Sequence, residues 1–175
     1  MNEKTQAQLR VVREVRDVLA DAGQIDWWLF GGWGLDARIG RITREHGDIE
    51  FWVARSDGDS VRDALVASGV TTLRTQPPEE SREFTKDGVS FSSAFFEACP
   101  DRTYRPRGRW SDWVFPADSF ERPHGHLGEL AVPAMSIAGM LAMKEQYPTL
   151  RNGGPLRDKD VRDLEILREL AQTGA

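Results

Sequence analysis

The chain has 175 residues, of which 39% are hydrophobic and 29% are charged, as expected for a soluble globular protein of ordinary size. Its formal net charge of -5 and pI near 5.3 argue against a nucleic-acid binder that relies on bulk positive charge, and no apolar run approaches the ~20 residues that span a bilayer. The single cysteine, Cys99, cannot form an internal disulfide, and residues 1–10 lack the apolar core of a signal peptide, so we expect a cytoplasmic protein without a membrane partner.

Apolar spacing and glycine positions predict an alternation of helices and strands. A short apolar run at residues 27–30 is closed by Gly31-Gly32, which predicts a buried strand that enters a tight turn. Asp87-Gly88 lies between two strand-like runs and tolerates the positive φ of hairpin turns, so it predicts a β-hairpin and a mixed or antiparallel sheet. In chain order, the predicted helices cover residues 9–19, 34–39, 56–68, 136–147 and 159–170. The predicted strands cover residues 27–30, 48–53, 70–73, 82–85, 89–96, 113–115 and 129–132, and residues 101–110 are predicted to be a loop.

Two carboxylates, Asp48 and Glu50, lie two positions apart on a predicted strand, so their side chains share one face. Such a pair can hold Mg²⁺, which proteins typically bind through one or two carboxylates plus substrate phosphates. The preceding Gly31-Gly32 turn lacks Cβ atoms and therefore lets backbone amides approach a phosphate closely. Each pattern alone is common, but the combination predicts a phosphate and metal site.

The stretch FGGWGLDARIGRITREHGDIE resembles the signature of the antibiotic-modifying nucleotidyltransferases, above all the aminoglycoside 2''-adenylyltransferases, with the lincosamide nucleotidyltransferases as close relatives. Both groups belong to the polymerase-β-like nucleotidyltransferase superfamily. Weaker similarity to the late helices of that family continues through VPAMSIAGMLAMKEQY and RDKDVRDLEIL. The resemblance implies an α+β (α/β) nucleotidyltransferase fold, a small mixed sheet flanked by helices, as a single domain over residues 1–175. The C-terminal helices, about residues 133–172, would form a small subdomain.

The resemblance also implies roles for individual residues. Asp48 and Glu50 are the implied catalytic residues and would hold two Mg²⁺ ions that bridge the triphosphate. The implied nucleotide-binding residues are Gly31, Gly32, Arg41, Arg44, His46 and Lys144. The reaction would be in-line attack of an acceptor hydroxyl on the α-phosphate of an NTP such as ATP, with release of pyrophosphate. The implied partners are the NTP and a small-molecule hydroxyl acceptor, such as an aminoglycoside or a lincosamide; nucleic acid is not expected, and a homodimer is left open.

One position departs from the family pattern. The family carries a third carboxylate on the strand after the hairpin, as general base or metal ligand, whereas this strand reads VSFSSAFFE. Ser90, Ser92 or Ser93 falls where the acid is expected, and a serine does not accept the acceptor's proton near neutral pH. Glu97 is displaced by over ~10 Å at ~3.3 Å per residue unless the strand bends. Either the reaction runs with two acids and a base from elsewhere, or the protein has lost transfer activity and binds a nucleotide or another ligand.

A metal-dependent hydrolase is a third hypothesis. His124, His126 and Glu129 combine imidazole and carboxylate groups, which are common zinc ligands. Their spacing matches no established zinc motif, and they lie in a segment rich in proline and glycine, so we rank this hypothesis below the other two.

Overall fold

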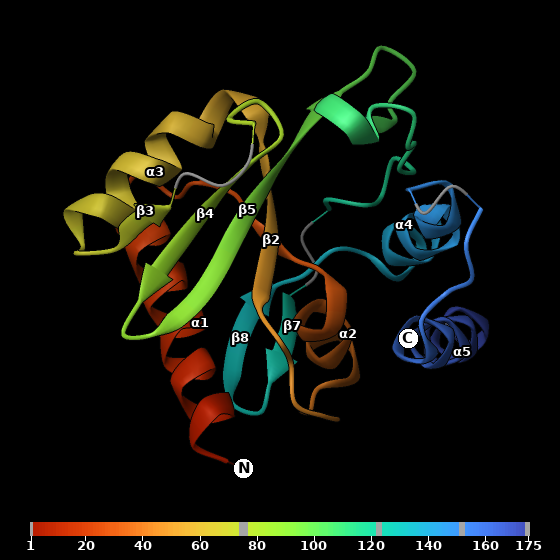
Figure 1. Ribbon diagram of the computed structural model, residues 1–175, viewed down its shortest axis with the longest axis horizontal. Coiled ribbons are helices and arrows are strands. Elements are labelled where there is room, and N and C mark those ends of the chain that lie inside the picture. The colour runs from red at the N-terminus through yellow and green to blue at the C-terminus, as the bar shows by residue number, and fades with distance from the viewer. Residues whose placement is uncertain (1, 74–76, 122–123, 151–152, 174–175) are drawn as a thin grey trace.

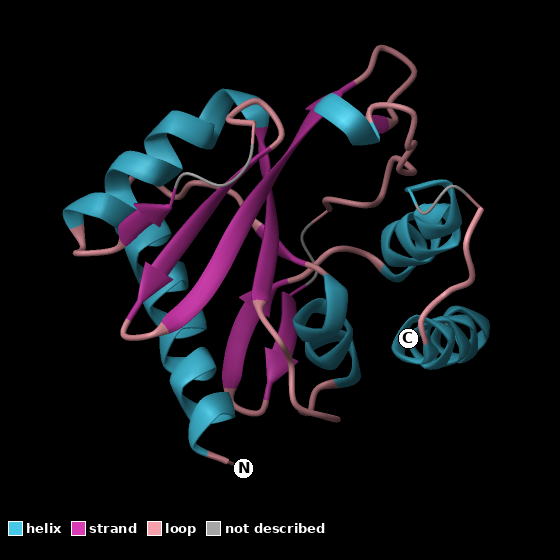
Figure 2. Ribbon diagram, viewed as in Figure 1, coloured by secondary structure: helices cyan, strands magenta, loops and turns pink. Residues whose placement is uncertain are grey.

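The computed structural model describes residues 2–73, 77–121, 124–150 and 153–173, and it confirms the expected α+β class, with a mixed sheet and helices (Figures 1 and 2). The helices are α1 (Glu3–Asp21), α2 (Gly31–Ile39), α3 (Gly58–Ala67), α4 (Ile137–Leu150) and α5 (Asp158–Thr173). The strands are β1 (Trp28–Leu29), β2 (Ile49–Ala54), β3 (Thr71–Leu73), β4 (Ser81–Lys86), β5 (Val89–Ala98), β6 (Tyr104–Pro106), β7 (His124–Leu127) and β8 (Leu130–Pro133). Two 3₁₀ turns are η1 (Arg55–Asp57) and η2 (Gly108–Trp110).

The main sheet has the strand order β1-β2-β5-β4-β3, and β6 pairs with the end of β5. β2 and β5 are parallel, whereas the other pairs are antiparallel. The pairing of β2 with β5 places Glu50 opposite Ser92, and the pairing of β5 with β4 places Ser92 opposite Glu83. Because directly paired residues lie on one face of a sheet, these three side chains form a row across three strands.

Each face of the sheet has its own apolar core, and successive residues of β2 alternate between them. Phe51 and Val53 belong to the core that α1 and α3 cover, at the left in Figure 1. Trp52 belongs to the second core, which receives Met140 and Met143 of α4 and Leu167 of α5, the two helices at the right. Glu50 shares the parity of Trp52 and therefore faces the side of the C-terminal helices.

The β7–β8 hairpin forms a separate two-stranded sheet against α2. Gly125 of β7 permits this contact, because a Cβ there would lie 2.6 Å from the carbonyl oxygen of Ala37. After β8, Met135 N donates a 2.8 Å hydrogen bond to the carbonyl oxygen of Leu29, which anchors the entry to α4 beside β1. No helix within the described ranges is long and apolar enough to cross a membrane.

The structure differs from the predicted elements in four places. The strand predicted at residues 113–115 is absent, because only Phe115 pairs there, in an isolated bridge with Tyr104. Gly31 and Gly32 are the first residues of α2 and not a turn that precedes it. Residues 101–110 contain β6 and η2, and His124–Leu127 forms β7, although both segments read as loops. β6 and β7 are short strands that exist through pairing with distant or neighbouring strands, and their own sequences carry little strand signal.

The β4–β5 turn generates a prediction about stability. Gly88 has φ +77°, so Gly88→Ala is expected to lower the free energy of unfolding by about 1 to 2 kcal/mol, measured by urea denaturation. Gly47→Ala is the matched control, because a Cβ there meets nothing within 4 Å and the residue lacks a positive φ. Equal losses in the two variants would contradict the prediction.

Candidate active site

The N-terminus of α2 opens into a polar pocket, defined here by Gly31, Gly32, Asp48, Glu50, Arg157 and Lys159 among its lining residues. The two glycines leave room for side chains on its wall: a Cβ on Gly31 would lie 3.1 Å from Glu50 Oε2, and one on Gly32 would lie 2.2 Å from His46 Nδ1. Gly31 also has φ +62°, which favours glycine. The first N–H groups of a helix have no partner within the helix and attract anions, so this end of α2 suits a phosphate.

The loop between α2 and β2, which carries Asp48, is fastened by the buried side chain of Asp36 on α2. Asp36 accepts hydrogen bonds from the backbone N (3.1 Å) and Oγ1 (2.5 Å) of Thr43 and lies 2.6 Å from His46 Nε2. Arg44 lies 3.0 Å from His46 Nδ1. Since a guanidinium can only donate, Nδ1 accepts and Nε2 carries the proton that it donates to Asp36.

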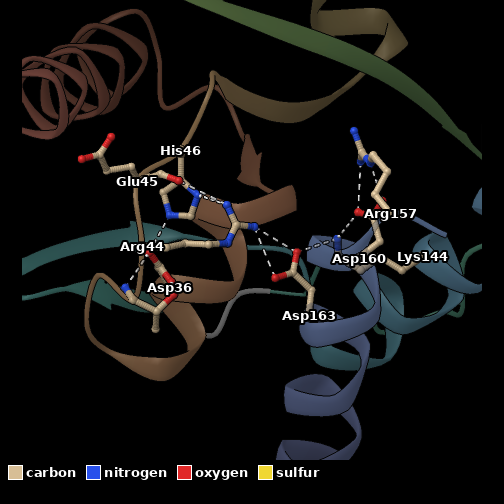
Figure 3. Close-up of polar contacts among 9 residues, drawn as sticks. Asp36, Arg44, Glu45, His46, Lys144, Arg157, Asp160 and Asp163 are labelled. Atoms are coloured by element: carbon tan, nitrogen blue, oxygen red, sulfur yellow. Dashed lines mark hydrogen bonds and ion pairs between the residues drawn. The ribbon is translucent and has the colours of Figure 1, made fainter.

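A chain of ion pairs continues from this loop to the C-terminal helices (Figure 3). Arg44 Nη2 lies 3.1 Å from Asp163 Oδ2 on α5, and the same oxygen lies 2.8 Å from Lys144 Nζ on α4. Lys144 also pairs with Asp160 at 3.2 Å, and Asp160 pairs with Arg157 at 2.5 Å. Lys144, Asp160 and Asp163 are all at most 3% exposed, so α4 and α5 are joined to the loop by buried charges.

Glu50 lies at the front of the pocket, where charge is poorly compensated. Burial, followed by repulsion from Asp48, raises the pKa of Glu50 to about 7, although Lys159, Lys144 and Arg157 oppose the shift. A bound cation would offset both the loss of solvation on burial and the repulsion between Glu50 and Asp48. In the described ranges no three His, Cys, Asp or Glu side chains gather in a way that could hold a metal alone. A pair of carboxylates therefore fits a hard ion such as Mg²⁺ that arrives with substrate phosphates.

On its other side, Glu50 lines a cavity of about 410 Å³, here called the acceptor cavity. Burial, and then the charge of Glu50, raises the pKa of Tyr147, so its hydroxyl remains a neutral hydrogen-bond donor. The residues from β6 to Trp113 form a strap over this cavity, held where Glu80 accepts hydrogen bonds from Arg109 N (2.7 Å) and Nε (2.9 Å). The aromatic residues of the wall are Phe30, Trp52, Trp110, Trp113 and Tyr147.

The structure separates the three serines of β5. Ser92 lies opposite Glu50 and lines the same cavity, whereas Ser90 is exposed and pairs with Thr85. Ser93 belongs to the opposite face of the strand and is fully buried. Ser90 and Ser92 both line a pocket with Asp48 and Glu50, and of these two serines Ser92 is the one that also lines the acceptor cavity.

Glu97 lies near the far end of β5, paired with Arg107 at 3.3 Å. His126 and Glu129 are exposed in and beside the β7–β8 hairpin, and the side chain of His124 lies outside the described part. Among the side chains that the structure describes, those of Glu97, His126 and Glu129 line none of the pockets that Glu50 lines.

Most of the site residues expected from the sequence line one pocket. Those brought together are Gly31, Gly32, Arg44, His46, Asp48, Glu50 and Lys144. Arg41 instead lines a second pocket with Ile39 and residues of α5. Sequence reasoning missed Asp36, Arg157, Lys159, Asp160 and Asp163. For three of these the signal is their spacing: Asp160 and Asp163 are three residues apart on one face of α5, and Arg157 lies three residues before Asp160, just ahead of the helix.

The buried ion pairs predict an asymmetric response to mutation. Asp163→Ala leaves Lys144 and Arg44 short of a partner, so the free energy of unfolding should fall by about 3 to 5 kcal/mol. Glu145→Ala is the matched control, because it breaks an exposed α4–α5 pair with Arg168 and should cost less than ~1 kcal/mol. Urea denaturation measures both, and similar losses would refute the prediction.

The pKa of Glu50 generates a prediction about pH. Because its folded pKa of about 7 exceeds the ordinary 4.5, the carboxyl contributes stability at low pH that is lost as pH rises through that interval. In metal-free buffer, Glu50→Gln should gain about 1 to 3 kcal/mol relative to the wild type between pH 5 and pH 8. Unfolding at the two pH values measures this, with exposed Glu129→Gln as control; a pH-independent difference would count against it.

Comparison with known proteins agrees with this geometry. A family model described as aminoglycoside-2''-adenylyltransferase matches residues 11–167. Curated 2''-aminoglycoside nucleotidyltransferases from Escherichia coli and Klebsiella pneumoniae are each 52% identical over 32 residues, which is 18% of this chain and 18% of each relative. The aligned stretch thus spans less than a fifth of those relatives.

Solved structures share the fold over nearly the whole chain. The crystal structure of ANT(2'')-Ia in complex with adenylyl-2''-tobramycin has a TM-score of 0.73 at 17% identity, covering 96% of this chain and 90% of that one. The lincomycin-bound lincosamide antibiotic adenylyltransferase LnuA has a TM-score of 0.65 at 21% identity, covering 95% and 98%. Together with the match of the family model to most of the sequence, the fold shows that the chain belongs to the aminoglycoside-2''-adenylyltransferase family.

Proposed function

We propose that this family member is a Mg²⁺-dependent nucleotidyltransferase that moves a nucleoside monophosphate from an NTP to a hydroxyl of a small molecule. The observation that carries the proposal is the position of Glu50, which lines both the polar pocket at the N-terminus of α2 and the acceptor cavity. A donor phosphate and an acceptor hydroxyl would meet there. Positioning of the two reactants and stabilisation of charge account for most catalysis in phosphoryl transfer.

The chain's own residues divide the work between the two substrates. Asp48 and Glu50 would hold two Mg²⁺ ions, which when bound supply the positive charge that neutralises the triphosphate. Gly31 and Gly32 would present backbone N–H groups to the phosphates. Lys159, exposed on the pocket wall, would pair with a phosphate oxygen.

Three further residues serve as support in this proposal. Arg44, His46 and Lys144 line the pocket but are already engaged with Asp36, Asp160 and Asp163, so they would hold the loop and helices in place. Arg41 lines a different pocket and receives no phosphate contact.

The acceptor classes proposed for testing are aminoglycosides and lincosamides. Family membership favours the first, and the structural neighbours, which carry adenylyl-2''-tobramycin and lincomycin, support testing both. A protein that binds a nucleotide without transferring it is the second candidate, favoured by Ser92 in place of a carboxylate beside Glu50.

An acceptor panel separates the two candidates. The protein is incubated with Mg²⁺, each NTP, and tobramycin, lincomycin and related compounds, and pyrophosphate release is followed. Acceptor-dependent release should appear and should fall at least ~100-fold in Asp48→Asn, because removal of a metal ligand exceeds the 10- to 100-fold typical of outer-shell losses. Nucleotide binding without turnover across the panel would support the binding protein.

The assignment of phosphate contacts has its own test. Lys159→Gln should weaken binding of ATP with Mg²⁺ by roughly 10- to 150-fold, the equivalent of one charge-assisted hydrogen bond. Arg41→Gln is the control and should leave the affinity unchanged. Calorimetric titration measures both, and a larger loss in Arg41→Gln would reverse the assignment.

A further inference from the structure

We propose that Glu83 of β4 is the general base of the transfer reaction and accepts the proton of the acceptor hydroxyl. The inference rests on the proposed function and deepens it by naming a general base. Glu83 lies on β4, next to the strand β5, where Ser92 falls at the position expected for the third carboxylate. Its basis is the position of Glu83 in the sheet, its free carboxylate, and the two cavities that it lines.

Strand register brings Glu83 to the site. Glu50 of β2 lies opposite Ser92 of β5, and Ser92 lies opposite Glu83 of β4. Neighbouring strands are ~4.8 Å apart, so the backbones of Glu50 and Glu83 are roughly 10 Å apart on the same face. Ser92, which lies between them, has a short side chain. The side chains of Glu50 and Glu83 can therefore both extend toward the space above Ser92.

Glu83 differs from neighbouring acids in having no structural partner. Glu80 is committed to Arg109, and Asp59 is committed to Arg82 at 2.5 Å. Within the described ranges, the half-buried carboxylate of Glu83 makes no hydrogen bond or ion pair. Because the carboxylate of Glu83 does not stabilise the fold through such a contact, it is available to accept a proton.

Glu83 also lines two pockets that Glu50 lines. It lines the acceptor cavity together with Glu50, Ser92 and Trp110. It lines an adjoining pocket together with Asp48 and Glu50. Of the acids that the structure places on the wall of the acceptor cavity, Glu50 belongs to the metal pair and Glu83 does not.

The reaction needs a proton acceptor at this place. The oxygen of the acceptor hydroxyl forms a bond to the α-phosphorus while its O–H bond breaks, and the proton moves to a carboxylate oxygen of Glu83. The bond between the α-phosphorus and the bridging oxygen breaks, and its electron pair leaves with pyrophosphate. No oxidant or further reactant is required, and the proton passes from Glu83 to solvent after the transfer.

The spacing argues for a base and against a third metal ligand. Mg²⁺ needs its oxygens at 2.0–2.1 Å, which ties ligands to one small region, whereas Glu83 starts two strands away from Glu50. A substrate hydroxyl that lies above Ser92 fills the intervening space. Ser92 itself leaves that space open because its side chain is short.

The test combines removal and relocation of the carboxylate in the full chain. The variants are Glu83→Gln, the same change combined with Ser92→Asp, and Glu97→Gln as a matched control on the far end of β5. The acceptor is tobramycin or lincomycin, whichever gives the higher wild-type rate. The readouts are kcat and KM for the acceptor, calorimetric affinity for ATP with Mg²⁺, and melting temperature.

Glu83→Gln is expected to lower kcat by ~10²- to 10⁴-fold, the usual contribution of a general base, while the affinity for ATP and the melting temperature stay near wild type. Ser92→Asp in that background should restore kcat at least tenfold, because it returns a carboxylate to the same row. Glu97→Gln should match the wild type.

Three results would overturn the inference while leaving the transferase intact. These are an unchanged kcat in Glu83→Gln, a loss explained by weaker ATP binding or a lower melting temperature, and a failure of Ser92→Asp to restore the rate. If the wild type binds ATP but transfers to no acceptor, the proposed function itself fails and the inference fails with it. The two failures are therefore distinguishable by the wild-type rate.

Discussion

The buried carboxylate of Asp163 joins the loop before β2 to the two C-terminal helices. It pairs with Arg44 of the loop before β2 and with Lys144 of α4. Charges removed from water are tolerated only beside close partners, so the loop, α4 and α5 fit together in one arrangement. The polar pocket exists through that arrangement, because Gly31 and Asp48 come from the first third of the chain and Lys159 comes from the last helix. Catalytic geometry thus depends on ion pairs that need not touch a substrate.

Charge is distributed unevenly within the site. On one wall of the pocket, Lys144, Asp160 and Asp163 neutralise one another. By contrast, the side chains of Asp48 and Glu50 make no hydrogen bond or ion pair with any part of the chain that the structure describes, and burial, followed by repulsion from Asp48, raises the pKa of Glu50. The paired residues stabilise the fold, and the two carboxylates without such partners are the ones proposed to bind a cation. Stability and reactivity are therefore carried by different residues of one cluster.

Local patterns predicted the elements that are stabilised locally. The helix at the N-terminus, the strand that carries Glu50 and the Asp87-Gly88 hairpin follow from apolar spacing and turn chemistry. β6 and β7 were missed because short strands depend on their partners. Gly31 and Gly32 were predicted to form a turn, whereas they are the first two residues of α2. The pair Asp48 and Glu50 could be found from the two-residue period of a strand. Asp160 and Asp163 were not predicted as site residues, because their burial depends on tertiary packing of α5 against α4 and the loop.

Glu83 was not predicted as a site residue, although part of the information that places it lies in the sequence. A two-residue hairpin turn fixes the register of both strands, so the sequence already implies that Glu83 lies opposite Ser92. What the sequence could not supply is the parallel pairing of β5 with β2, which brings Glu50 to the other side of Ser92. Parallel neighbours are joined by long connections, and here helix α3 and two strands intervene between them.

The strap over the acceptor cavity is fastened to the fold by the pairing of β6 with β5 and by the contact of Arg109 with Glu80. A Cβ on residue 108 would lie 2.1 Å from the side chain of Glu80, so glycine is required for this close approach. Arg109 donates two hydrogen bonds to the same carboxylate. The strap contributes Trp110 and Trp113 to the cavity but nothing to the face that carries Asp48. In the proposed function, substitutions in the strap would change the shape offered to an acceptor without altering the pocket that Gly31 and Asp48 line.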